Sequence, residues 1–210
     1  MTRTLLLGCA ALGLAACSAE GDIESGGIVV ARDICPQVAI PAGTGSVTLF
    51  DPANSTQAGA IDVTASITNV RPQCFQDTSS IVTTTRYDVY AQRRDAGPAR
   101  TVVLPVFNTV MRGGETIVSK RVGQVRLDFA AGAIRAEAQG EATVRVDRRA
   151  ATLPSDVRAE LTRRRKAGDV DAAIDPLSKP EIRSAVANAT FEQLVGFQLT
   201  PQQLQYNATK

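Results

Sequence analysis

The structural period of this chain is clearest in the stretch IRAEAQGEATVRVD, which spans residues 134–147. Every second residue of this stretch is apolar or small, and the residues between them are polar or charged. Successive side chains of an extended chain point to opposite faces of a sheet, so the alternation predicts an antiparallel strand with one buried face. The stretch therefore indicates a protein built from half-buried sheets.

The preceding segments have the same character. Ile61–Thr68 alternates between apolar and polar residues, and the segments that flank it are rich in residues that suit a pleated surface. The runs Thr101–Arg112 and Glu115–Leu127 meet at Gly113 and Gly114. Because glycine has no Cβ atom, this pair permits the positive φ angles of a type I′ turn and predicts a hairpin.

The period changes after residue 149. Leu153, Val157 and Leu161 fall at helical spacing, and a second helical stretch is predicted around Pro180–Ala187, before alternation returns in the final strand. We therefore predict a mainly β protein: an antiparallel Ig/fibronectin-III-like β-sandwich with a short helical insert, residues 153–187, before the last strand.

The first residues have the character of a secretion signal. Arg3 supplies a positive charge, and the apolar run that follows it is shorter than the ~20 residues that a membrane-spanning helix requires. The run ends in Leu14-Ala15-Ala16-Cys17. These four residues resemble the lipobox of bacterial lipoproteins, in which Leu, a small residue, and Ala or Gly precede the cysteine that is lipidated.

This resemblance implies that Cys17 receives a diacylglycerol, that the chain is cut before it, and that the new amino group is acylated. Three acyl chains make attachment effectively permanent, since each buried methylene contributes about 0.8 kcal/mol. Ser18 follows the cysteine, where an aspartate would have indicated retention in the inner membrane. We therefore expect an outer-membrane lipoprotein that faces the periplasm. A plain secretory peptide cleaved after Ala16 and a retained transmembrane helix are the alternatives.

The chain then divides into four regions. Residues 1–16 are the expected signal peptide, 17–34 a flexible tether, 35–200 the β-sandwich domain with its insert, and 201–210 a C-terminal tail. The stretches Phe191–Thr200 and Leu204–Asn207 are similar to the tails of uncharacterised bacterial lipoproteins of this size. That similarity implies a secreted, β-rich fold and carries no chemical motif.

The cysteines predict one disulfide. Cys9 would leave with the signal peptide and Cys17 would carry lipid, which leaves Cys35 and Cys74 in an oxidising compartment. Closing a loop of about 40 residues would stabilise the fold by on the order of 4 kcal/mol. Two cysteines in a chain without histidine make a poor metal site by comparison.

The composition also limits the chemistry. The chain contains no histidine, so Ser-His-Asp and Cys-His machinery is excluded, and it contains no glycine-rich nucleotide-binding sequence. The formal net charge of +2 gives no indication of a nucleic-acid partner. We therefore expect a protein that is not an enzyme and uses no cofactor and no metal.

One basic cluster is a candidate contact surface. It could bind lipid phosphates or an acidic protein surface, whereas the alternative is a solvated helix end whose cations offset the helix dipole. The cluster consists of Arg158, Arg163, Arg164, Arg165 and Lys166.

Location and missing chemistry together favour a lipid-anchored periplasmic component of a cell-envelope assembly, structural or accessory in role. Such a protein would contact the membrane through its lipid and an envelope protein through a sheet edge or the helical insert. The alternative is a periplasmic binding module for a small molecule, lipid or glycan. A concave pocket lined by convergent polar groups would favour the binding module, and an exposed apolar surface would favour the assembly component.

Overall fold

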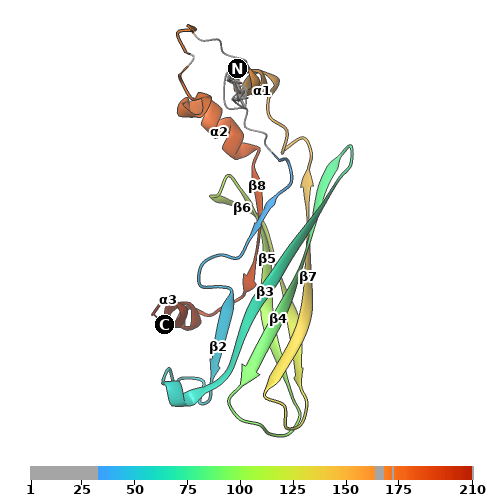
Figure 1. Cartoon of the computed structure of the whole chain (residues 1–210), viewed down its shortest axis with the longest axis vertical. Coiled ribbons are helices and arrows are strands. Elements are labelled where there is room, and N and C mark those ends of the chain that lie inside the picture. The colour runs from blue at the N-terminus through green and yellow to red at the C-terminus, as the bar shows by residue number, and fades with distance from the viewer. Residues whose placement is uncertain (1–32, 164–167, 172, 210) are drawn as a thin grey trace, which may run out of the picture.

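The protein is a sandwich of two sheets, with short helices at its periphery (Figure 1). The computed structural model describes residues 33–163, 168–171 and 173–209. The prediction of a mainly β, two-sheet architecture is confirmed. The expected signal peptide, nearly all of the expected tether and the lipidation site Cys17 lie outside the described residues.

Each sheet has four strands, and we name each sheet after one of its edge strands. The β6 sheet has the order β1-β8-β5-β6 and the β7 sheet the order β2-β3-β4-β7. Neighbouring strands pair antiparallel, except that β1 runs parallel to β8. The strands are β1 (Gln37–Ala39), β2 (Ser46–Phe50), β3 (Ile61–Gln76), β4 (Ser80–Arg93), β5 (Arg100–Arg112), β6 (Thr116–Phe129), β7 (Arg135–Asp147) and β8 (Phe191–Phe197).

The strand predictions agree with burial. In β7 the apolar residues Ala142, Val144 and Val146 are buried, while the residues between them are exposed. The predicted hairpin between β5 and β6 is also confirmed, because Gly113 and Gly114 have φ angles of 65° and 75°. A side chain at either glycine would be strained at these angles.

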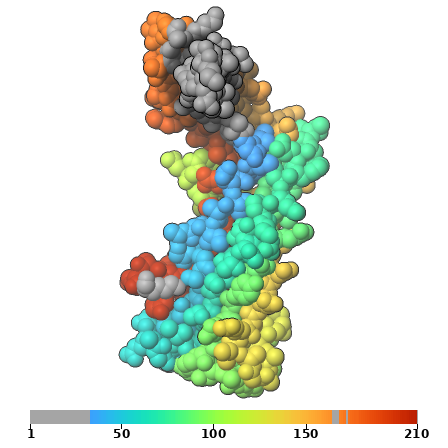
Figure 2. Space-filling view, in the orientation of Figure 1, coloured from blue at the N-terminus to red at the C-terminus, as the bar shows by residue number. Residues whose placement is uncertain are grey.

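The helices lie in two places. The helices α1 (Ser155–Thr162) and α2 (Pro180–Asn188) stand between β7 and β8 in the sequence and lie together at one end of the elongated molecule (Figures 1 and 2). The 3₁₀ turn η2 (Pro176–Ser178) contacts α2, and η1 (Ala58–Ala60) precedes β3. The first predicted helix ends at Thr162, directly before Arg163 of the basic cluster.

The segment expected to be a C-terminal tail contains a helix, α3 (Pro201–Thr209). Thr200 and Gln203 form a reciprocal capping box: each side chain accepts a hydrogen bond from the main-chain N–H of the other. The amide of Asn207 donates to the main-chain oxygens of Gly43 and Ser46, both at 2.7 Å. The helix therefore fixes the segment that crosses from β1 to β2.

Polar side chains join the two sheets across the middle of the core. Gln193 of β8 is fully buried, and its Nε2 donates to the main-chain oxygen of Ala142 on β7 at 3.0 Å. Its Oε1 accepts a hydrogen bond from Thr85 of β4 at 2.8 Å. Asn108 of β5 donates through Nδ2 to the oxygen of Thr143 on β7 at 3.1 Å. These bonds fix which strands of one sheet face which strands of the other.

A buried arginine, Arg93, holds together the end of the sandwich that lies away from α1 and α2 (Figure 1). The side chain of Arg93, at the end of β4, donates to four main-chain oxygens, and its guanidinium lies 5.3 Å from the ring centroid of Phe129. Two acceptors precede β5 and two lie between β6 and β7. The arginine therefore joins two loops that connect different sheets.

Replacing Arg93 with lysine should lower the free energy of unfolding by roughly 3 kcal/mol. An ammonium group cannot reach four carbonyl oxygens, and each buried acceptor left without a donor costs about 1–3 kcal/mol. Chemical denaturation of the full-length protein measures the change. Arg135→Lys, at an exposed position of β7, is the matched control and should change stability by less than about 0.5 kcal/mol. Equal effects of the two substitutions would contradict this role.

Candidate functional site

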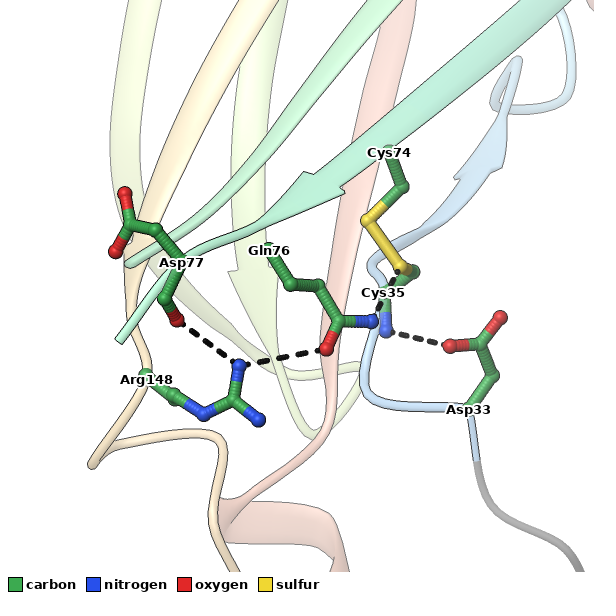
Figure 3. Close-up of a disulfide and its surroundings, with 6 residues drawn as sticks. All are labelled: Asp33, Cys35, Cys74, Gln76, Asp77 and Arg148. Carbon is green, nitrogen blue, oxygen red and sulfur yellow. Dashed lines mark hydrogen bonds between the residues drawn. A yellow bond between two sulfur atoms is a disulfide. The ribbon is translucent and has the colours of Figure 1, made fainter. Parts of the chain in front are cut away.

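The cysteines predicted to pair form a disulfide (Figure 3). The Cα atoms of Cys35 and Cys74 are 6.2 Å apart, and the bond joins the segment before β1 to the far part of β3. The main-chain N–H of Cys35 donates to the carboxylate of Asp33, and the amide of Gln76 donates to the sulfur of Cys35. The bond fixes the point where the chain enters the domain and is structural in role.

The structure places two members of the predicted basic cluster, Arg158 and Arg163; the other three lie outside the described residues. Arg158 is an exposed residue of α1 whose guanidinium donates to the main-chain oxygen of Leu153. Arg163 follows α1 and forms ion pairs with Glu160 and Asp171. The guanidinium groups of Arg158 and Arg163 therefore join neighbouring segments of the chain to each other. A partner contact by the basic cluster stays a prediction.

The carboxylates with strong partners also serve the fold. Asp88 of β4 accepts hydrogen bonds from Arg71 and Asn69, which hold the pKa of its carboxyl below the usual value. Folding therefore stabilises the ionised form, and that contribution is lost as the pH falls through the lowered pKa. This arrangement ties β3 to β4.

The surface that stands out is the first part of β6. Its first nine residues, Thr116–Gln124, are all exposed, whereas inward-facing residues later in the strand are buried. Three of the nine are large and apolar: Ile117, Val118 and Val122 are 61%, 53% and 55% exposed. A strand that is exposed on both faces at the edge of a sheet is unusual for a protein that works alone. We call Thr116–Gln124 the open edge.

The geometry of the two sheets explains the exposure. The bonds from Asn108 and Gln193 hold β7 opposite β5 and β8 at this level. β6 lies one strand farther out than β5, and its first part is not packed against the β7 sheet, since all nine of its residues are exposed. The β6 sheet therefore extends beyond the β7 sheet, and the tips of the β5–β6 and β3–β4 hairpins point to different sides of the molecule (Figure 1).

A groove lies where the sheets separate. It has a volume of about 460 Å³ and runs between Arg121–Val125 of β6 and Gln139–Thr143 of β7. Tyr87 of β4 and Asn108 of β5 also line it. The inner face of the open edge, including the guanidinium-bearing residue Arg121, therefore borders a groove and not a packed core.

Main-chain hydrogen bonds establish which groups of the open edge are free. The N–H of Gln198 donates to the oxygen of Pro105 at 2.8 Å, so Pro105 directs its main-chain polar atoms toward β8. Alternate residues of an antiparallel strand point to opposite neighbours, so Val106 points toward β6, where it pairs with Gly123. Gly123 therefore points back toward β5.

It follows that Lys120, Val122 and Gln124 direct their N–H and C=O groups away from β5. No described strand pairs with this side of β6. The open edge therefore offers a row of main-chain donors and acceptors, which is the arrangement that an added strand requires.

A second depression lies on the β7 sheet. It is an open groove of about 960 Å³, lined mostly by small and polar residues of the four strands of this sheet, together with Asp128 of β6. Tyr90, which is 46% exposed, is its aromatic member, while Arg135 and Glu137 lie at the β7 side. The groove could hold a ligand through hydrogen bonds, but among its lining residues only a few are charged.

Sequence reasoning did not identify the open edge. The segment Glu115–Leu127 was predicted as a strand of the sandwich, which is correct, but its exposure was not foreseen. A signal is present in the sequence: Ile117 and Val118 are adjacent, as are Lys120 and Arg121, so neither face of the strand is uniformly apolar. A loss of alternation inside an otherwise alternating strand can thus indicate an edge without a facing sheet.

Comparison with known proteins assigns this chain to no family. No family model matches the chain, and neither a curated protein nor a solved structure matches it. Within the described ranges, no group of three or more His, Cys, Asp or Glu residues could hold a metal ion. No helix in the same ranges is long and apolar enough to cross a membrane.

Replacing Cys35 and Cys74 together with alanine should lower the free energy of unfolding by about 4 kcal/mol, because a loop of 39 residues is no longer closed in the unfolded chain. Calorimetry should show a melting temperature lower by roughly 10 °C. As a control on the pairing itself, neither thiol of the unfolded wild-type chain should react with an alkylating agent before reduction. Reaction of both would contradict the bond.

Proposed function

We propose that this protein is a non-enzymatic accessory component of a bacterial cell-envelope assembly, held on the outer membrane by lipid on Cys17 and facing the periplasm. The observation that carries this proposal is the open edge, where free main-chain groups, exposed apolar side chains and a groove coincide. An added strand from a protein partner would satisfy the main-chain groups and cover the apolar side chains. A lipid anchor and an edge that can pair with a partner strand together suit a protein that holds a partner protein at the membrane.

We also propose that the sandwich is Ig/fibronectin-III-like. In immunoglobulin-type sandwiches one sheet contains strands A, B and E, the other contains C, F and G, and C′ lies beside C in the larger forms. The order β3-β4-β7 supports an A-B-E assignment, and β6-β5-β8 supports C′-C-F. In this assignment β1 takes the place of G, parallel to β8, and β2 is an added edge strand.

A binding module for a small molecule, lipid or glycan is the second candidate, favoured by the groove of about 960 Å³ on the β7 sheet. Its hydroxyl and amide side chains and the exposed ring of Tyr90 would suit a sugar. The open edge offers exposed apolar side chains together with unpaired main-chain N–H and C=O groups. A ligand bound in the groove of the β7 sheet would leave those main-chain groups without hydrogen-bond partners. We therefore favour the partner-binding role.

Cys17→Ser should leave a full-length precursor without lipid, because the thiol is the proposed acyl acceptor. Mass spectrometry of the membrane fraction measures the mass of the N-terminal peptide. Cys9→Ser, which removes the other thiol of the leader, is the matched control and should be processed normally. Finding unmodified Cys17 in the membrane fraction of cells that make the wild-type protein would refute lipid anchoring.

Val122→Pro should abolish partner contact without unfolding the domain. The N–H of Val122 points away from β5, so proline removes no internal ladder bond but blocks an added strand. A photoreactive residue at position 124 should yield a discrete crosslinked protein in living cells, and this product should disappear in the Val122→Pro background. The same photoreactive residue at position 92, in the groove of the β7 sheet, tests the binding-module alternative.

The melting temperature of Val122→Pro should stay within a few degrees of wild type, and Lys120→Pro provides a second edge-blocking variant because its N–H also points outward. If position 124 yields no product, or if both proline variants leave the product unchanged, the open edge is not the contact surface. A crosslinked product from position 92 and none from position 124 would favour the binding-module role of the groove on the β7 sheet.

A further inference from the structure

We infer that the occupant of the open edge is an extended segment of a different protein that carries adjacent carboxylates among apolar residues. This inference rests on the proposed function and specifies the partner's chemistry. Between Thr116 and Gln124 the chain has two cations, Lys120 and Arg121, and no carboxylate. In the described part of the protein neither cation forms an ion pair, although other exposed arginines do.

The two cations lie on opposite faces of the strand. Arg121 pairs with Asn108 and lines the groove on the inner face. Lys120 lies on the outer face, where its Nζ is 5.3 Å from the ring centroid of Phe107. Because side chains of an added strand also alternate between faces, two adjacent residues of the partner would stand opposite Lys120 and Arg121.

The apolar side chains define the rest of the segment. Val122 is on the outer face beside Phe107, with which it pairs, and Ile117 and Val118 are exposed near the hairpin tip. A partner residue opposite Val122 that is β-branched or aromatic would bury apolar area on the same face. The segment that fits therefore has two central carboxylates flanked by apolar residues and an extended backbone.

A second copy of this chain fits the open edge less well. If two copies paired antiparallel with Lys120 at the centre, the two Lys120 side chains would lie opposite each other, and with Arg121 at the centre the two Arg121 side chains would do so. Pairing centred on Val122 would place the two Arg121 side chains diagonally adjacent. The register that brings Glu115 opposite Arg121 runs through Val118, where the pairing of β6 with β5 is irregular. Like charges and this irregularity both oppose edge-to-edge association of identical chains.

The test uses the full-length protein, extracted in detergent, and three labelled ten-residue peptides. One alternates valine and threonine around two central glutamates, the second has lysines in place of the glutamates, and the third is the glutamate peptide with prolines at three strand positions. Fluorescence anisotropy at 50 mM salt should show the glutamate peptide binding at least tenfold more tightly than the lysine peptide. The preference should shrink at 500 mM salt, because exposed charges are screened, and the proline peptide should not bind.

Charge reversal provides the decisive variant. The double substitution Lys120→Glu with Arg121→Glu should reverse the preference, so that the lysine peptide binds more tightly than the glutamate peptide. Arg149→Glu, an exposed arginine in the turn after β7, is the matched control and should leave the preference unchanged. Reversal of the preference cannot be produced by simple loss of folding, which would abolish binding of both peptides.

The outcomes separate this inference from the proposed function. If both peptides bind equally, or neither binds, while Val122→Pro still removes the crosslinked product in cells, the carboxylate-bearing partner is wrong and the edge function stands. If the crosslinked product is absent as well, both are wrong. If sedimentation shows a dimer that Val122→Pro dissociates, the occupant is a second copy and the inference is overturned.

Discussion

Two side-chain amides determine how the sheets overlap. Gln193 and Asn108 donate to the main-chain oxygens of Ala142 and Thr143, and leaving the buried amide of Gln193 without partners would cost about 1–3 kcal/mol. The bonds therefore hold β7 opposite β5 and β8 in the middle of the molecule. Farther along β6, inward-facing residues such as Leu127 pack into the same core cluster as Ala142. One end of β6 is thus covered by the opposing sheet and the other is not.

Contacts elsewhere in the domain hold the open edge of β6 in this position relative to the β7 sheet. Arg93 joins two loops at one end, the disulfide holds the entering chain, and α3 holds the crossing from β1 to β2. A surface that is already ordered loses less conformational entropy when a partner binds. Lys120 and the irregular pairing at Val118 are devices that discourage strand edges from pairing with their own kind. The edge is therefore suited to a partner of different charge.

The sequence by itself determined the elements that depend on local chemistry. Alternation predicted β7, the pair Gly113 and Gly114 predicted the hairpin, and helical spacing with Pro180 at a first turn predicted α2. The disulfide followed from counting cysteines in an expected oxidising compartment. The helix α3 was also within reach, since Thr200 followed three residues later by Gln is a capping-box signature. Each of these signals lies within a few residues or in the composition.

The tertiary structure alone decided which strands face water. Ile117 and Val122 have the residue types of a core strand, yet both are more than half exposed, Ile117 near the hairpin tip and Val122 on the outer face of the β6 sheet. Gln193 falls on the apolar face of β8 and is nevertheless fully buried, because its partners come from β4, β5 and β7. Burial of a strand depends on the order of strands in each sheet and on how the sheets overlap. Those relations join residues that are far apart in sequence, so no local pattern contains them.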